Sequence, residues 1–159
     1  MDPGTHRLGY GLVEEAEGEI AALTWGVLAP GRRLPLGHRL HHIHTELLKL
    51  MERWEPTEVA VEEPFVSQNP RTAIAIGQAQ AVALIAAASR GMDAARYAPA
   101  EVKRAVTGYG GSSKDQVQRS VCMQLDIEES DMAEDAADAL AVALCHIRAR
   151  TEKQILAQG

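Results

Sequence analysis

The sequence predicts an α/β domain in which helices flank a mixed β-sheet. Two segments, 8–13 and 20–28, have the composition of paired strands and are joined by polar residues at 14–19. Apolar residues three and four apart then predict an amphipathic helix over 36–54. Strand and helix patterns alternate after this point. A hairpin followed by such alternation is typical of a layered α/β domain.

The later elements follow from local signals. The short apolar stretch at 58–63 reads as a buried strand that ends on two acids, Glu62 and Glu63. Asn69-Pro70 pairs an N-cap with proline at the first helical position, which predicts a helix that stops near Gly91. We expect a strand at 94–97 and helices at 99–106, at 114–125 after a capping box beginning at Ser113, and at 133–148.

The composition indicates one globular domain, which we expect to cover 1–150 with a tail at 151–159. Of the 159 residues, 46% are hydrophobic and 24% charged, which is ordinary for a folded domain. The net charge of −6 argues against indiscriminate coating of nucleic acid, although a metal-dependent nuclease concentrates acids at its site.

Several absences suggest a cytoplasmic protein without a membrane partner. The first residues lack the charged start and apolar stretch of a signal peptide, and no apolar run reaches the length of a spanning helix. Cys122 and Cys145 form no disulfide or metal-binding pattern, which favours a reducing compartment.

Acidic residues near the ends of elements are the candidates for chemistry. Asp2 begins the chain, Glu62 closes a buried strand, and Asp135 and Asp138 share one face of an alanine-rich helix. Carboxylates are the ligands of Mg²⁺, and two such ions can hydrolyse a phosphodiester. On composition alone, however, acids near a helix start more often serve only to stabilise the helix dipole.

Short segments in a specific order carry a resemblance. They lie at 2–5 with 9–11, 59–62, 65–70, 76–79, 101–103 with 106 and 108, 114 with 116–118, and 135–141. Through them nearly the whole chain resembles the RuvC-type Holliday-junction resolvases. The resemblance implies an RNase H-like fold with a mixed five-stranded sheet. It also implies a homodimer and Mg²⁺-dependent nicking of two opposed strands of four-way junction DNA in recombination and repair.

The resemblance also implies roles for individual residues. Two Mg²⁺ ions per site, with Mn²⁺ as an alternative ion, would be held by the catalytic acids Asp2, Glu62, Asp135 and Asp138. Lys103 and Lys114 would contact the DNA backbone, and Phe65 would stack on a base of the opened junction. A RuvAB-type branch-migration complex would be a partner, and the 70–89 helix would lie at the dimer axis.

The chain departs from the family pattern at its first residue. Family members place an apolar strand before the Asp-Pro-Gly turn, whereas here Met1 directly precedes Asp2. The first central strand is therefore largely missing, which predicts a weakened core and a poorly held Asp2. We hypothesise that the natural protein begins a few residues earlier.

Other interpretations of the sequence stay open beside the resolvase. The chain could be an RNase H-like nuclease acting on another substrate, a junction-binding protein that no longer cleaves, or a scaffold assembled through its alanine-rich helix. The histidine cluster on the 36–54 helix is expected to be solvated; its members are His38, His41, His42 and His44. None of them has a recognised zinc spacing with cysteines or acids.

Overall fold

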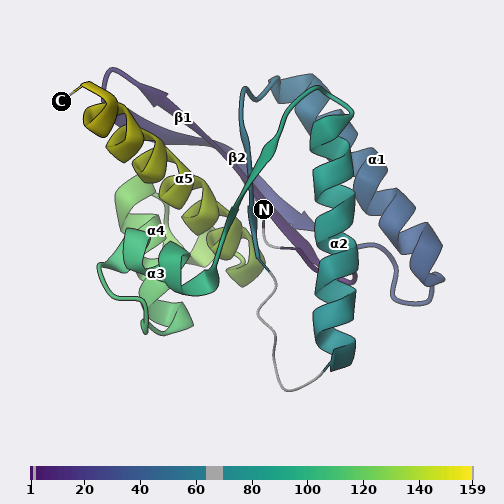
Figure 1. Cartoon of the computed structure of the whole chain (residues 1–159). Coiled ribbons are helices and arrows are strands. Elements are labelled where there is room, and N and C mark those ends of the chain that lie inside the picture. The colour runs from purple at the N-terminus through teal and green to yellow at the C-terminus, as the bar shows by residue number, and fades with distance from the viewer. Residues whose placement is uncertain (2, 64–69, 159) are drawn as a thin grey trace.

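The structure is a computed structural model that describes residues 1, 3–63 and 70–158 (Figure 1). Its strands are β1 (Leu8–Ala16), β2 (Glu19–Leu28), β3 (Val59–Glu62) and β4 (Ala94–Tyr97). Its helices are α1 (Leu36–Trp54), α2 (Pro70–Ala88), α3 (Pro99–Thr107), α4 (Lys114–Leu125) and α5 (Glu134–Gln158), with a short 3-10 turn at Glu129–Asp131. The order of elements expected from the sequence is confirmed.

The first two strands form an antiparallel hairpin that is longer than expected. Pairing runs from Leu8 opposite Leu28 to Ala16 opposite Glu19. Only Glu17 and Gly18 lie between the strands, and both have positive φ angles of 55° and 86°. Two consecutive positive φ angles are typical of the tight turns whose twist matches a hairpin. The expected polar turn over 14–19 is therefore wrong, because its outer residues continue the strands.

The expected five-stranded sheet does not form within the described residues. They contain two separate two-stranded sheets, the antiparallel β1–β2 pair and a parallel pair of β3 with β4. At the position of the missing central strand only Met1 bridges toward β3: its amino group donates to the Ala60 carbonyl at 2.9 Å, and the Glu62 N–H donates to the Met1 carbonyl at 3.1 Å. A single residue cannot join the two pairs into one sheet.

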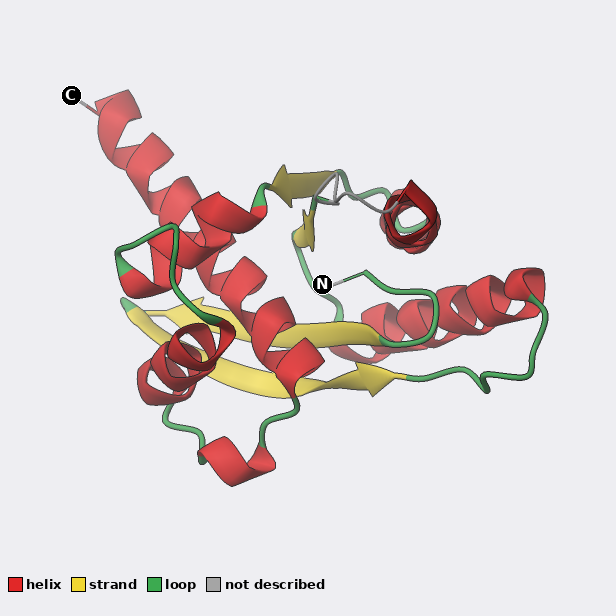
Figure 2. Ribbon diagram, turned by 90° about the horizontal axis from the view of Figure 1, so that it is seen from below, coloured by secondary structure: helices red, strands yellow, loops and turns green. Residues whose placement is uncertain are grey.

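Two hydrophobic clusters hold these layers together. In Figure 1, α1 and α2 stand together on one side of the strands, while α3, α4 and α5 group on the other. Figure 2 shows α5 crossing the β1–β2 pair. The first cluster centres on α5 with α3 and α4, and Leu140 and Val121 are fully buried in it. The second joins α1 and α2 to β3 through Ile43, Ala83 and Val61, all of which are 0% exposed.

Helix α2 is the least covered of the long helices. Residues 71–88 are long and apolar enough to cross a membrane by length and composition, so the expectation that no such stretch exists is wrong. Alanines account for much of this hydropathy. Ala79, Ala83, Ala86 and Ala87 are buried, but Ile74 and Ile85 are 62% and 56% exposed. One face of α2 therefore packs inside the domain and another presents apolar side chains outward.

Local signals fixed the start of α4, while the end of α5 differs from expectation. Ser113 accepts from the backbone N–H of Gln116, and the Gln116 side chain accepts from the backbone N–H of Ser113, which confirms the capping box. Helix α5 continues to Gln158, past its expected end at Arg148. The side chains of residues 152–157 are exposed, so this extension adds little to the core.

Both cysteines are free thiols buried beneath α5 and α4. Burial raises the pKa of Cys145 to about 11, with help from the Glu101 carboxylate, and burial also raises the pKa of Cys122. A raised folded-state pKa contributes stability that is complete below the unfolded pKa and is lost as the pH rises. We therefore expect the thermal midpoint to fall between pH 9 and pH 11. A C145A variant should lose less over that interval, as measured by circular dichroism; an equal loss would contradict this assignment.

Candidate nuclease active site

Two of the expected catalytic acids lie at the start of α5 against strand β1. Asp135 and Asp138 are one helical turn apart, so their side chains share a face. The helix approaches the strand so closely that a Cβ atom on Gly9 would lie 1.8 Å from the Asp135 carbonyl oxygen. The absence of a side chain at Gly9 thus allows α5 to hold both acids directly on the sheet.

Asp138 is the more buried of these two acids. Its side chain is 24% exposed, and the Lys114 ammonium lies 3.7 Å from its Oδ2 atom. Burial raises the pKa of Asp138; Lys114 opposes the shift, and the Glu134 and Asp135 carboxylates add to it. Lys114 also pairs with Glu134. The start of α5 is therefore a cluster of acids that repel one another and attract a cation.

Glu62 ends strand β3 and has a different set of supports. Its N–H donates to the Met1 carbonyl at 3.1 Å, and its own carbonyl accepts from Nε2 of Gln80 at 3.1 Å. The next residue, Glu63, donates its N–H to the Tyr97 carbonyl at 2.8 Å and so continues the pairing with β4. Main-chain bonds from three elements thus hold the end of β3 in place.

The segment that precedes β1 touches both groups of acids. Met1 binds the backbone of Glu62, and Nε of Arg7 donates to Oδ2 of Asp135 at 2.5 Å. Asp2 follows Met1 in the sequence, but Asp2 and Phe65 lie outside the described residues. Within the described ranges, no three His, Cys, Asp or Glu side chains gather into a group that could hold a metal ion. The structure therefore brings Asp135 and Asp138 together and leaves Glu62 on a separate element.

The two predicted DNA-binding lysines lie on neighbouring helices. Lys114 is the first residue of α4 and contacts the acid cluster. Lys103 is half-buried on α3, a helix that packs against α5, and its carbonyl accepts from the Thr107 hydroxyl at 2.8 Å. The structure thus places Lys114 at the acids and Lys103 on an adjoining helix.

Sequence reasoning missed two residues that support the site. Arg7 neutralises Asp135 from a position 128 residues away in the chain, so no local pattern could indicate the pair. Gln80 is 8% exposed and is one of the few buried polar residues in the described part of the chain. Its amide was visible as a lone polar group among the alanines of α2, which is a signal for a specific hydrogen bond.

The histidine cluster on α1 lies apart from these acids. His38, His41 and His42 are exposed, as expected for solvated side chains, and His44 is half-buried. Ile43 and Leu47 occupy the buried face of the same helix.

Comparison with known proteins identifies the family. The sequence model described as "Crossover junction endodeoxyribonuclease RuvC" matches residues 1–146. The chain belongs to the RuvC family. A RuvC of Dehalococcoides mccartyi strain 195 is 43% identical over 159 residues, covering 100% of this chain and 96% of the relative. That of Moorella thermoacetica is 47% identical over 150 residues, covering 92% of this chain and 87% of the relative.

Solved structures of RuvC proteins have the same fold. T. thermophilus RuvC in complex with Holliday junction substrate has a TM-score of 0.86 and 33% identity, with 95% of this chain and 93% of that chain covered. Another structure of Thermus thermophilus RuvC has a TM-score of 0.84 and 34% identity, covering the same shares of both chains. The resemblance deduced from ordered short segments is therefore confirmed, and the enzyme class is that of a nuclease.

Proposed function

We propose that this chain is an endonuclease that resolves four-way DNA junctions by paired, symmetric, Mg²⁺-dependent nicks. The observation that carries the proposal is the RuvC family match over 1–146, together with the likeness to a RuvC bound to a Holliday junction substrate. The cluster of acids and lysine at the start of α5 supports it. Water is the nucleophile in this proposal, so no side chain needs the geometry of an activated serine or cysteine.

The proposed metal ligands are Asp2, Glu62, Asp135 and Asp138. The donor set fits Mg²⁺, which prefers carboxylate oxygens. The raised pKa of Asp138 supports this fit, because burial and neighbouring carboxylates already disfavour its charge and a cation would relieve both effects. Two bound Mg²⁺ ions, or Mn²⁺ in their place, would activate the attacking water and stabilise the leaving oxygen.

The basic residues have a separate proposed task. Lys114 shares its charge between Glu134 and Asp138, so its ammonium lies where a phosphate near the acids would accept it. Arg7, paired with Asp135, adds a second cation at the same end of α5. Lys103 would hold the backbone further along the DNA, and Phe65 would stack on an unpaired base.

A labelled four-way junction with a mobile core tests the proposed reaction. We expect the chain to make paired nicks on opposed strands in Mg²⁺ and none on a linear duplex of the same sequence. An E62Q variant should bind the junction and fail to nick it. Nicking of the linear duplex or of RNA at an equal rate would favour an RNase H-like nuclease of other specificity. Junction binding without nicking under every metal condition would favour a binding protein.

The exposed face of α2 is proposed as the homodimer contact. Ile74 and Ile85 are exposed on this helix, while Gly77 and the neighbouring alanines allow a second helix to approach closely. Two active sites related by a two-fold axis would suit the paired nicks on a symmetric junction.

We expect an I85E variant to shift the protein from dimer to monomer in analytical ultracentrifugation, because the charge would be buried at the contact. Its far-ultraviolet circular dichroism should not change, since Ile85 is 56% exposed in the single chain. I155E is the matched control, because Ile155 is also exposed, at 66%, but lies on the carboxyl-terminal part of α5. An unchanged dimer in I85E, or a monomer in I155E, would contradict the assignment.

The remaining parts of the proposal concern cellular context. The chain would act in the cytoplasm on chromosomal junctions, without a membrane partner, and a RuvAB-type branch-migration complex would deliver the junction. We propose one nuclease domain over 1–150, with residues 151–159 not required for nicking.

A further inference from the structure

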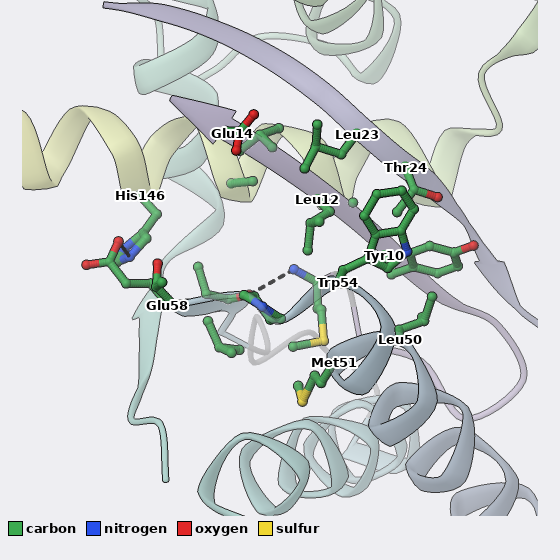
Figure 3. A pocket seen from close by; sticks show the side chains of 18 of the residues that line it. Tyr10, Leu12, Glu14, Leu23, Thr24, Leu50, Met51, Trp54, Glu58 and His146 are labelled. Atoms are coloured by element: carbon green, nitrogen blue, oxygen red, sulfur yellow. Dashed lines mark hydrogen bonds and ion pairs between the residues drawn. The ribbon is translucent and has the colours of Figure 1, made fainter. Parts of the chain in front are cut away.

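A cavity of about 370 Å³ separates strand β1 from strand β3 (Figure 3). Residues 10–15 of β1 line one side of it, and residues 56–60, which lead into β3, line the opposite side. Side chains of α1 and α5 complete the lining. None of the described acids expected to bind metal lines this cavity, so it is distinct from the candidate active site.

Met1 enters this cavity with the hydrogen bonds of a β-strand. Its amino group donates to the Ala60 carbonyl at 2.9 Å, and its carbonyl accepts from the Glu62 N–H at 3.1 Å. Bonds from one residue to the two neighbours of Val61 are the pattern of a parallel strand pair. Met1 therefore lies opposite Val61, and a chain continuing backward from it would lie opposite Ala60 and then Val59.

The backbone of β3 is oriented for such a continuation. Successive N–H groups of a strand point to alternate sides, and the N–H groups of Glu62 and Glu63 point to Met1 and to Tyr97 of β4, respectively. The N–H of Ala60 accordingly points to the same side as that of Glu62, toward the cavity. It is the next donor that an added parallel strand would use.

The cavity lining defines the chemistry of the occupant. Leu47 and Met51 of α1 line one face, and Ala143 and Ile147 of α5 line the other, so a strand between them has apolar surroundings on both faces. Such strands consist of continuous apolar residues rather than alternating ones. At the outer end Glu58 pairs with Arg150 and with His146, so a polar residue fits there. About four to six residues would span this distance at 3.3 Å per residue.

We propose that the cavity between β1 and β3 is the seat of an additional apolar β-strand, formed by residues joined to the amino group of Met1. The strand would run parallel to β3, lie antiparallel to β1, and join the two pairs of strands into one sheet. Two observations favour residues of the same chain. The nitrogen of Met1 already lines the cavity in the required register. The D. mccartyi relative also has residues outside a match that covers all of this chain.

A five-residue amino-terminal extension, Lys-Thr-Val-Ile-Val, after an initiating methionine tests the proposal, and its readouts require neither DNA nor metal. Fused to the full 159-residue chain, it should raise the thermal midpoint by about 5 °C or more, because it buries apolar side chains on two faces. Hydrogen exchange at the Ala60 amide should slow by about tenfold or more, since that N–H gains an acceptor. The Val61 amide, which points toward β4, should change less.

Two extensions of equal length serve as controls. One replaces both valines by aspartate, which places charges on the apolar α5 face, and the other is Gly-Ser-Gly-Ser-Gly; neither should stabilise the protein nor protect Ala60. Equal effects from all three extensions, or none from the apolar one, would overturn the proposal. Protection of Ala60 by the free peptide but not by the fused extension would also overturn it, because the occupant would then be a strand from another molecule.

Discussion

Replacement of Asp138 by asparagine is expected to reduce the rate of junction nicking by on the order of 10²–10³-fold while leaving the fold intact. The carboxylate is a proposed metal ligand, and the neutral amide of similar shape binds Mg²⁺ weakly. Burial already raises the pKa of Asp138, so the folded protein holds its charge at a cost. Loss of that charge should therefore leave the free energy of unfolding unchanged or slightly higher, which separates the catalytic effect from a folding effect.

The matched control is E134Q on the same first turns of α5. Glu134 also pairs with Lys114, but its side chain is 58% exposed and is not a proposed ligand. Single-turnover nicking at several Mg²⁺ concentrations, with a thermal scan of each variant, distinguishes the two acids. We expect D138N to lose activity at every concentration and E134Q to remain within about threefold of the parent, as surface ion pairs contribute little. Equal losses in both variants would assign the effect to the position of Lys114 instead of to a metal ligand.

The same region shows which features the sequence could predict. Asp135 and Asp138 were correctly expected on one face of a helix, because a spacing of three is a local property of helical geometry. The bounds of α1 and the capping box at Ser113 were predictable for the same reason. The pairing of Arg7 with Asp135 was not, since it joins residues 128 apart in the chain.

The sheet required information that local patterns do not contain. Each strand was identified from its own residues, but whether β1 and β3 belong to one sheet depends on what lies between them. Met1 alone occupies that place in the described chain, and two separate pairs result. Similarly, polar residues at 14–16 predicted a turn, although pairing with β2 keeps them in the strand. Tertiary pairing overrides composition at such positions.

Substitution of Gly9 by alanine is expected to destabilise the protein by about 3 kcal/mol or more, beyond the usual cost of an overpacked site. The added Cβ would lie 1.8 Å from the Asp135 carbonyl oxygen and 2.5 Å from its carbonyl carbon. Both atoms are backbone, so no side-chain rotation can relieve the clash, and α5 must move off the sheet. G37A is the control, because nothing lies within 4 Å of its added Cβ. Within helix α1 that change should stabilise by about 0.5–1 kcal/mol. Urea unfolding followed by tryptophan fluorescence measures both.

The clash at Gly9 also couples stability to the proposed chemistry. A helix lifted from β1 carries Asp135 and Asp138 with it and separates Asp135 from Arg7, while the end of β3 keeps its bonds from Gln80. The distance between Glu62 and the α5 acids would therefore change even in molecules that remain folded. We expect G9A, measured at a temperature where it is still folded, to lose nicking while it still binds the junction. A G9A protein that is as stable and as active as the parent would show that the close contact of α5 with β1 does not position these acids.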